Sequence, residues 1–169
     1  PGGHWISIVH VLATANDLKL DVVAEAYARV GLAIHDAFIT CWRSKFDTYL
    51  LRPVTYIQAN IDAAWDPLLT TPGFPTYTSG HSTQSGAAAT VLTGQFGPVA
   101  FTDTTHTDLN PGLALADRSF ANFLDAANEA AASRLYGGIH WPFDNQDGFN
   151  HFVISVDRLP LEQVTKQLN

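Results

Sequence analysis

The chain has 169 residues, of which 46% are hydrophobic and 15% are charged, so it can bury a sizeable core and has a globular composition. Its formal net charge of -7 argues against nucleic acid or an anionic membrane as partner, because both attract basic surfaces. The single Cys41 excludes a disulfide within the chain, and no apolar run is long enough to span a bilayer.

The sequence begins at Pro1 and contains no methionine. We therefore expect a processed or truncated piece of a longer product, whose targeting segment could have been lost with the missing part. We expect residues 1–169 to form a single soluble domain. Its compartment is unknown from the sequence, and export to the periplasm or the medium stays open.

Hydrophobic periodicity predicts a long helix over residues 17–44, with Asp17 as its N-cap. Residues 62–79 contain three prolines and a glycine and are expected to form a loop. A second helix, rich in small residues, is predicted to follow this loop and to end near Gly94 or Gly97. The small side chains would permit close packing against neighbouring helices.

Residues 99–110 are predicted to be a polar loop. Asn110 and Pro111 have the pattern of an N-cap followed by proline in the first turn, and they predict a helix that ends at Gly137-Gly138. A last helix is expected from about residue 143 or 145 to Val156. Because alternating runs of β-branched residues are absent, we expect an all-α helical bundle.

Three short blocks combine a cation or an imidazole with glycine or proline at a predicted helix boundary. In the first block, Lys45 and Arg52 are seven residues apart, which on one helix would place them on the same face. Pro53 disfavours helical geometry at Arg52, so we expect the pair to straddle a helix end. The second block, Ser79 to His81, opens a helix, where free N–H groups favour an anion. In the third, Arg134 lies on the last turn of a helix and His140 follows its glycines.

Together the blocks supply two guanidinium groups, an ammonium, a hydroxyl, helix N–H groups and two imidazoles. This is the set of donors that binds a tetrahedral oxyanion such as phosphate or vanadate. A zinc site is the alternative that the spacing of His140 and Asp144 suggests. Three nearby cations would repel a divalent metal, so an oxyanion is the better occupant.

In this order and spacing, the blocks resemble the three-part signature of the type 2 phosphatidic acid phosphatase (PAP2) and vanadium haloperoxidase superfamily. The stretches HDAFITCWRSKFDTYLLRPVTYI and FPTYTSGHSTQSGAAA resemble its bacterial haloperoxidase branch more than the membrane lipid phosphatases. Complete members of that branch are longer, so the resemblance implies a carboxy-terminal, site-bearing part. One departure is Thr78, where the family usually has proline. The residues that carry the match are Lys45, Arg52, Pro53, Ser79, Gly80, His81, Ser133, Arg134, His140 and Asp144.

The resemblance implies a helical bundle with the site at helix ends and vanadate as cofactor, with phosphate able to occupy the same site. It implies that His140 binds vanadium, or attacks phosphorus in the phosphatases, and that His81 is the acid–base residue. Asp144 would orient the His140 imidazole through its second nitrogen. The aromatic Phe74, which resembles the chloride-oxidising pattern, is the candidate halide-pocket residue. The oxygens of the anion would be held by Lys45, Arg52, Ser79, Gly80 and Arg134.

The leading hypothesis is a vanadate-dependent haloperoxidase that oxidises halide with hydrogen peroxide, in which Lys45 polarises the peroxide and His81 supplies protons. The alternative is an acid phosphatase that hydrolyses a phosphate ester through a phosphohistidine at His140. A third hypothesis is a remnant without activity that binds phosphate or nothing. The expected partners are these small molecules, without nucleic acid or a membrane span. A homo-oligomer, or association with the missing part of the chain, stays open.

Overall fold

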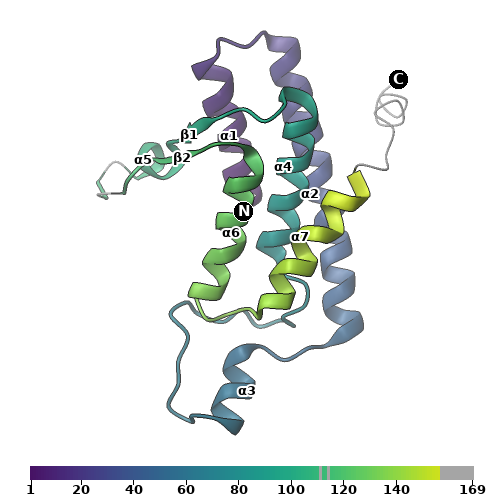
Figure 1. The fold of residues 1–169 in the computed structure, drawn as a ribbon, viewed down its shortest axis with the longest axis vertical. Helices are drawn as coiled ribbons and strands as arrows, with labels where there is room; N and C mark the ends of the chain where they lie inside the picture. Colours follow the sequence, from purple (N-terminus) through teal and green to yellow (C-terminus); the bar gives the residue numbers. More distant parts are fainter. Residues whose placement is uncertain (111, 114, 157–169) are drawn as a thin grey trace.

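The computed structural model describes residues 1–110, 112–113 and 115–156, and of residues 151–156 only the backbone. Helices dominate, and a two-stranded hairpin projects from one side of the bundle (Figure 1). None of the helices in these ranges combines the length and apolarity needed to cross a membrane. In chain order the elements are α1 (Gly2–Ala15), α2 (Leu20–Thr48), α3 (Pro53–Asn60), α4 (Gly80–Phe96), β1 (Phe101–Asp103), α5 (Thr105–Leu109), β2 (Arg118–Phe120), α6 (Phe123–Tyr136) and α7 (Pro142–Val156).

Helix α4 is the central helix of the bundle and packs against α1, α2, α6 and α7. Two glycines let α4 and α7 approach each other closely. A Cβ at Gly86 would come within 3.1 Å of the Phe149 carbonyl oxygen, and one at Gly148 within 2.9 Å of the Thr83 hydroxyl oxygen. The close approach joins the start of α7 to the start of α4, because the Ser79 N–H donates to the Asp144 carbonyl at 3.0 Å.

The apolar core lies between α1, α2, α4, α6 and the hairpin. The aromatic ring of Phe101 on β1 packs against those of Phe120 and Phe123, with centroids 5.5 and 5.3 Å away. Burial of these side chains in water-free contact supplies the main stabilisation of this half of the bundle. The fully or nearly fully buried apolar residues include Trp5, Ile8, Val9, Leu12, Val30, Leu92 and Phe123.

The all-α prediction is confirmed in class, but two helix starts were predicted wrongly. Helix α2 begins at Leu20 with Lys19 as N-cap, whereas Asp17 lies in the preceding turn with φ 47°. The last turn of α5 precedes Asn110, which is the C-cap of that helix. The N-cap of α6 is Asn122, whose side chain accepts a hydrogen bond from the Asp125 N–H at 2.9 Å.

The segment predicted as a loop over residues 99–110 contains β1 and α5, and the helix predicted from Asn110 is interrupted by β2. Strands β1 and β2 pair antiparallel, with Phe101 opposite Phe120. Each strand has only three residues, too short for an alternating pattern to appear in the sequence. Pro111, which was expected in the first turn of the long helix, lies outside the described residues.

At the end of the bundle opposite the turn between α1 and α2, α2 ends, α4 begins, α6 ends and α7 begins (Figure 1). Helix α3 and the loop that follows it lie beyond this end. The three sequence blocks therefore come together at one end of the bundle.

Candidate active site

Lys45 lies on the last turn of α2 and is completely buried. Its Nζ donates to the carbonyl oxygens of Pro75 at 3.0 Å, Thr76 at 3.0 Å and Thr78 at 2.6 Å. All three ammonium protons thus go to the loop that precedes α4, and Lys45 anchors that loop. Burial is the main cause that lowers the pKa of Lys45 to about 8.

Arg52 does not share a helix with Lys45, and the pair lies on either side of a helix end, as Pro53 predicts. Helix α2 ends at Thr48, Tyr49 takes a left-handed conformation with φ 51°, and Arg52 becomes the N-cap of α3. The guanidinium nonetheless turns back to the same loop, where its Nε donates to the Phe74 carbonyl at 2.9 Å. Its Nη1 donates to the Ile139 carbonyl at 2.7 Å, and its Nη2 is buried without a hydrogen-bond partner among the described residues.

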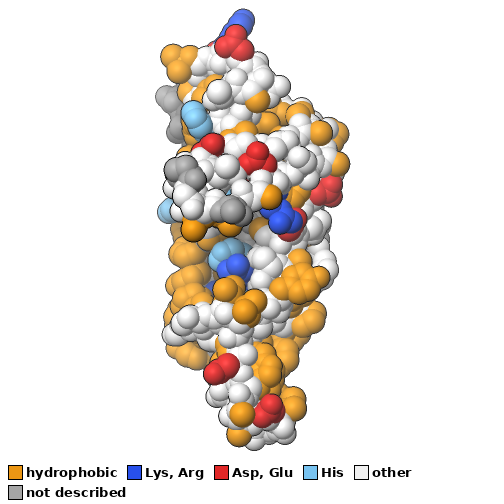
Figure 2. Space-filling model, turned by 90° about the vertical axis from the view of Figure 1, so that its left-hand side faces the viewer, with side chains coloured by type: hydrophobic (Ala, Val, Ile, Leu, Met, Phe, Trp, Pro, Cys, Tyr) orange, Lys and Arg blue, Asp and Glu red, His pale blue; other side chains and the backbone are white. Residues whose placement is uncertain are grey.

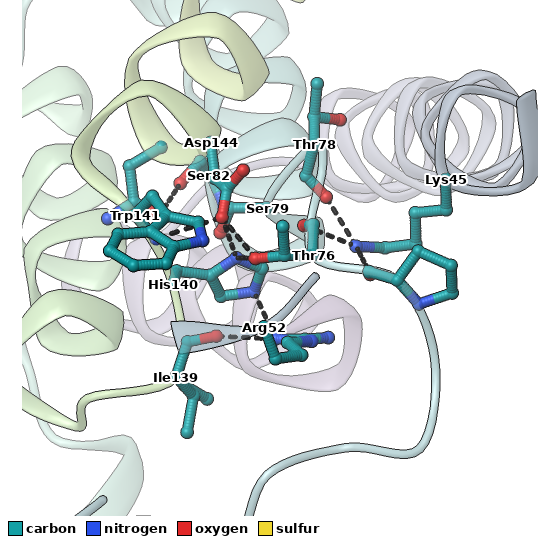
Figure 3. Close-up of polar contacts among 12 residues, drawn as sticks. Lys45, Arg52, Thr76, Thr78, Ser79, Ser82, Ile139, His140, Trp141 and Asp144 are labelled. Atoms are coloured by element: carbon teal, nitrogen blue, oxygen red, sulfur yellow. Dashed lines mark hydrogen bonds and ion pairs between the residues drawn. The ribbon is translucent and has the colours of Figure 1, made fainter. Parts of the chain in front are cut away.

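His140 is held between Asp144 and Arg52 (Figure 3). Its Nδ1 lies 3.0 Å from Asp144 Oδ2, and its Nε2 lies 3.1 Å from Arg52 Nη1. Because a carboxylate only accepts and a guanidinium only donates, Nδ1 carries the proton and Nε2 presents its lone pair. Burial lowers the pKa of His140, opposed by the hydrogen bond to Asp144 and assisted by the charge of Arg52.

The turn that brings His140 to this position depends on Gly138, which has φ 72°. Arg134 lies on the last turn of α6, and the chain reverses after it, so that His140 stands just before α7. Asp144 lies in the first turn of α7, where the helix dipole favours a negative charge. Its Oδ2 also accepts from the Trp141 N–H at 2.9 Å, which fixes the carboxylate.

Thr76 is a member of this cluster that the sequence analysis missed. Its hydroxyl donates to Asp144 Oδ2 and lies 3.2 Å from His140 Nδ1. Its carbonyl accepts from Lys45, and the residue is fully buried. A threonine in a proline-rich loop predicts only a turn, so no local signal marks its hydroxyl as part of the site.

Ser79 is the N-cap of α4, and its side chain accepts from the Ser82 N–H at 3.5 Å. Gly80 is the first residue of the helix, and a Cβ there would meet only the Trp42 ring at 3.7 Å, an ordinary contact. Packing within the chain therefore does not require glycine at this position, whereas close approach of a ligand to the backbone would. Thr78 stands where the resemblance led us to expect proline. A hydrogen bond holds its side chain in place, because its hydroxyl lies 3.2 Å from that of Thr83.

His81 and Arg134 form the outer part of the site. Arg134 Nη1 lies 3.2 Å from His81 Nε2, and Arg134 Nε donates to the Ser133 hydroxyl at 3.1 Å. Burial and then the charge of Arg134 lower the pKa of His81 to about 3, with His140 as a smaller cause, so the free imidazole is neutral. Of the predicted site residues in the described part of the chain, only His81 and Arg134 line a cavity of about 650 Å³.

The sequence model of the VCPO second helical-bundle domain matches residues 25–152. The chain belongs to this family. It is similar to a bacterial vanadium-dependent iodoperoxidase of known structure, with 41% identity, a TM-score of 0.86, and coverage of 95% of this chain and 39% of that one. The predicted resemblance to bacterial vanadium haloperoxidases is thus confirmed. Among curated proteins, none matches the chain in sequence.

Two more distant structures show the same fold. The holo form of a bacterial vanadium-dependent chloroperoxidase is 18% identical, with a TM-score of 0.74 and coverage of 92% of this chain and 39% of that one. An apo form is 15% identical, with a TM-score of 0.69 and coverage of 91% and 43%. The chain therefore spans about two fifths of the length of the haloperoxidases that it resembles.

The site of this VCPO-type domain fits a vanadate ion. The fit rests on Arg52 Nη2, which has no hydrogen-bond partner among the described residues, on His140 Nε2, and on the N–H groups at the start of α4. The contact of His140 Nε2 is Arg52 Nη1 at 3.1 Å, so the ligand atom faces a cation whose remaining N–H groups can bind the oxygens of an anion. The predicted contact from Lys45 is different, because its protons are already bound to carbonyls.

Phe74 covers the two innermost cations of this VCPO-type site. Its ring centroid lies 5.3 Å from Lys45 Nζ and 5.1 Å from the guanidinium carbon of Arg52. Its ring also packs on that of Trp42, with centroids 5.0 Å apart. The candidate halide-pocket residue thus lies directly at the cation cluster.

Proposed function

We propose that this chain carries the vanadate site of a haloperoxidase that oxidises halide with hydrogen peroxide. The observation that carries the proposal is the His140 imidazole, fixed by Asp144 at Nδ1 and presenting Nε2 to Arg52, whose Nη2 has no partner in the described part of the chain. Bound vanadate would supply the activation of peroxide toward halide. The relationship to a vanadium-dependent iodoperoxidase at 41% identity supports this choice of cofactor.

In this proposal His140 Nε2 is the ligand atom, and Asp144 keeps the proton on the other nitrogen. The guanidinium of Arg52 binds the oxygens of the anion, since its planar fork matches paired oxygens. Arg134 binds them from the side of the cavity, together with Ser79 and the N–H of Gly80. Lys45 adds positive charge and holds the loop in place, which raises the affinity for an anion without a direct contact.

His81 is the proposed acid–base residue. It is neutral in the free site, because burial and Arg134 disfavour the imidazolium. It can therefore accept a proton from hydrogen peroxide as the substrate binds, and return it when water leaves. His81 also lines the cavity of about 650 Å³, which leaves room beside it for hydrogen peroxide.

Phosphate ester hydrolysis would use the same residues, with His140 attacking phosphorus and His81 protonating the leaving oxygen. The geometry serves both reactions, and the haloperoxidase relationship supports halide oxidation as the proposed one. The 41%-identical relative is an iodoperoxidase, whereas Phe74 resembles the chloride-oxidising pattern, so iodide and chloride are both candidate substrates. Both halides are therefore tested, together with bromide, whose reactivity is intermediate.

The experiment incubates the 169-residue chain with orthovanadate, hydrogen peroxide and chloride, bromide or iodide in turn, and measures halogenation of a phenol-type acceptor. Hydrolysis of p-nitrophenyl phosphate is measured in parallel without vanadate. We expect vanadate-dependent halogenation that His140→Ala abolishes and that His35→Ala, a change at an exposed histidine outside the site, leaves unchanged. Phosphate ester hydrolysis that depends on His140, without halogenation, would replace this function with the phosphatase.

A further inference from the structure

We propose that Asn145 is a positioning residue that sets the distance between Arg134 and His140 by fastening α6 to α7. The proposal rests on the proposed function, since Arg134 and His140 are groups that would hold the anion. The hydrogen bonds of Asn145 itself go to Ser82 and Ala131, which have no part in binding the anion. It therefore acts through the placement of the helices.

The side chain of Asn145 joins three helices. It lies at the start of α7 and is buried. Its Nδ2 donates to the Ala131 carbonyl of α6 at 2.5 Å, and its Oδ1 accepts from the Ser82 hydroxyl of α4 at 3.1 Å. Because a backbone carbonyl only accepts, the NH₂ end of the amide must face Ala131, which leaves the oxygen for Ser82. Both polar ends of the buried amide thus have a partner.

The hydrogen bond between α6 and α7 lies close to the anion site along both helices. Ala131 precedes Arg134 by three residues, less than one turn of α6. Asn145 directly follows Asp144, the partner of His140. The contact therefore ties the end of α6 that carries the arginine to the start of α7.

Packing alone does little to fix the distance between α6 and α7. Both helices pack far more extensively on α4 than on each other. Among the described residues, the amide of Asn145 makes the only hydrogen bond between these two helices. Their separation near the site therefore depends on this contact and on the short reversal that connects them.

The side chain of Arg134 is not held toward α7 by contacts of its own. Its described hydrogen-bond contacts are His81 on α4 at 3.2 Å and Ser133 on α6 at 3.1 Å, and no described ion pair includes it. His81 and Arg134 line the cavity of about 650 Å³ beside the hairpin. On the face in Figure 2, a histidine and a basic side chain lie next to each other below the hairpin. The backbone of α6 must therefore place Arg134 relative to His140.

A neutral amide suits this position better than a carboxylate or an apolar side chain. A carboxylate would repel the Ala131 carbonyl and the adjacent Asp144, and its charge would weaken the attraction for an anion. An apolar side chain would deprive the buried Ser82 hydroxyl of its acceptor. Asparagine links the helices without changing the charge of the site.

The test is a double-mutant cycle on the binding of inorganic phosphate and of orthovanadate, measured by calorimetry without peroxide or halide. Asn145→Leu keeps nearly the shape of asparagine but loses both hydrogen bonds. We expect it to weaken binding by about 10-fold in wild type and by less than about 2-fold once Arg134→Ala has removed the guanidinium. A merely structural role would lower the affinity equally in both backgrounds, and that result would overturn the proposal.

Asn150→Leu is the matched control, the same change at an exposed position of α7, where the side chain accepts from Gln146 at 3.1 Å. We expect it to leave the affinity unchanged. Asn145→Ala, which adds no bulk, is carried through the same cycle and keeps the test decisive should Asn145→Leu not fold. Wild-type affinity in a folded Asn145→Ala would also overturn the proposal.

Crystal structures of wild type and Asn145→Ala give a readout that needs no anion. We expect the Arg134 guanidinium to lie farther from His140 by about 1 Å or more in the variant, a shift large enough to disturb a binding site. The contact of 3.0 Å between His140 and Asp144 should be kept. An unmoved guanidinium would overturn the positioning role. Failure of the proposed function has another signature: wild type would then bind neither phosphate nor vanadate, while the displacement would still decide the role of Asn145.

Discussion

The Nδ1 of His140 lies 3.0 Å from Oδ2 of Asp144 across the start of α7, and this contact turns the other ring nitrogen toward Arg52. The carboxylate is fully buried and accepts from three donors at the same oxygen, which fixes its position. One ion-pair geometry therefore decides both the tautomer and the direction of the His140 imidazole.

Asp144→Ala should lower vanadate affinity by about 10- to 100-fold, the usual cost of losing a carboxylate that orients a ligand histidine. The variant removes the acceptor of Nδ1–H, so the ring can rotate and take the other tautomer. Vanadate binding is measured by calorimetry, with the far-ultraviolet circular dichroism spectrum as the check on folding. A folded variant with wild-type affinity and rate would show that Asp144 serves only to start α7.

Gly138→Val should reduce vanadate affinity to a comparable degree without removing any functional group. Gly138 has φ 72°, which a β-branched residue adopts only under strain, and a Cβ would lie 3.1 Å from that of Pro67. The reversal between α6 and α7 would shift and misplace His140. Gly73→Val is the matched control, because a Cβ there meets nothing within 4 Å. Equal loss in both variants would contradict the positioning role of Gly138.

The sequence predicts the parts of this site that depend on local signals. The start of α4 after Ser79 and the end of α6 before Gly137-Gly138 are given by capping and glycine. The helix end between Lys45 and Arg52 is likewise given by Pro53, whereas the left-handed conformation of the C-cap Tyr49 has no signal of its own in the sequence. The role of Thr76 was missed because its partner, Asp144, is 68 residues away along the chain.

Thr76→Val should weaken vanadate binding, while Thr76→Ser should restore most of it. Valine keeps the shape of the threonine side chain but leaves Asp144 Oδ2 without one of its three donors. The readout that a merely structural role would not move is the low-field proton resonance of the His140–Asp144 hydrogen bond. We expect this resonance to move in Thr76→Val and to return in Thr76→Ser. An unchanged resonance in Thr76→Val would exclude an effect of the hydroxyl on this pair.

His140→Ala should abolish vanadate binding, whereas His81→Ala should leave it weakened but detectable. In the proposed site His140 would supply the ligand atom, while His81 would contact the bound anion only through a hydrogen bond. Both variants are titrated with orthovanadate by calorimetry, and His10→Ala, on the exposed side of α1, is the control. Equal loss in the two variants would contradict these separate roles.

Anion binding should take up a proton at His81. Its pKa is about 3 in the free site, so the imidazole is neutral at pH 6, and a bound anion would raise this pKa by favouring the imidazolium. Affinity for phosphate should then fall as the pH rises from about 3 toward the pKa of the complex, and His81 should no longer affect it above that pKa. Calorimetry in two buffers of different ionisation enthalpy measures the uptake, and His81→Gln should lose it. Uptake that persists in His81→Gln would assign the proton to another group.

The buried Lys45 should make the free energy of unfolding depend on pH in the alkaline range. Its pKa falls from 10.5 to about 8 on folding, so between these values the unfolded chain binds more protons than the native one. The contribution of Lys45 to the free energy of unfolding must therefore rise with pH across this window.

Lys45→Met lacks this contribution and also leaves the loop carbonyls of Thr76 and Thr78 without their donor. Urea unfolding at pH 7.5, 8.5 and 9.5 measures both effects: the variant should be less stable at each pH, and its deficit should widen as the pH rises. A constant deficit would mean that Lys45 keeps its proton in the native state throughout, held by the three carbonyls that surround it.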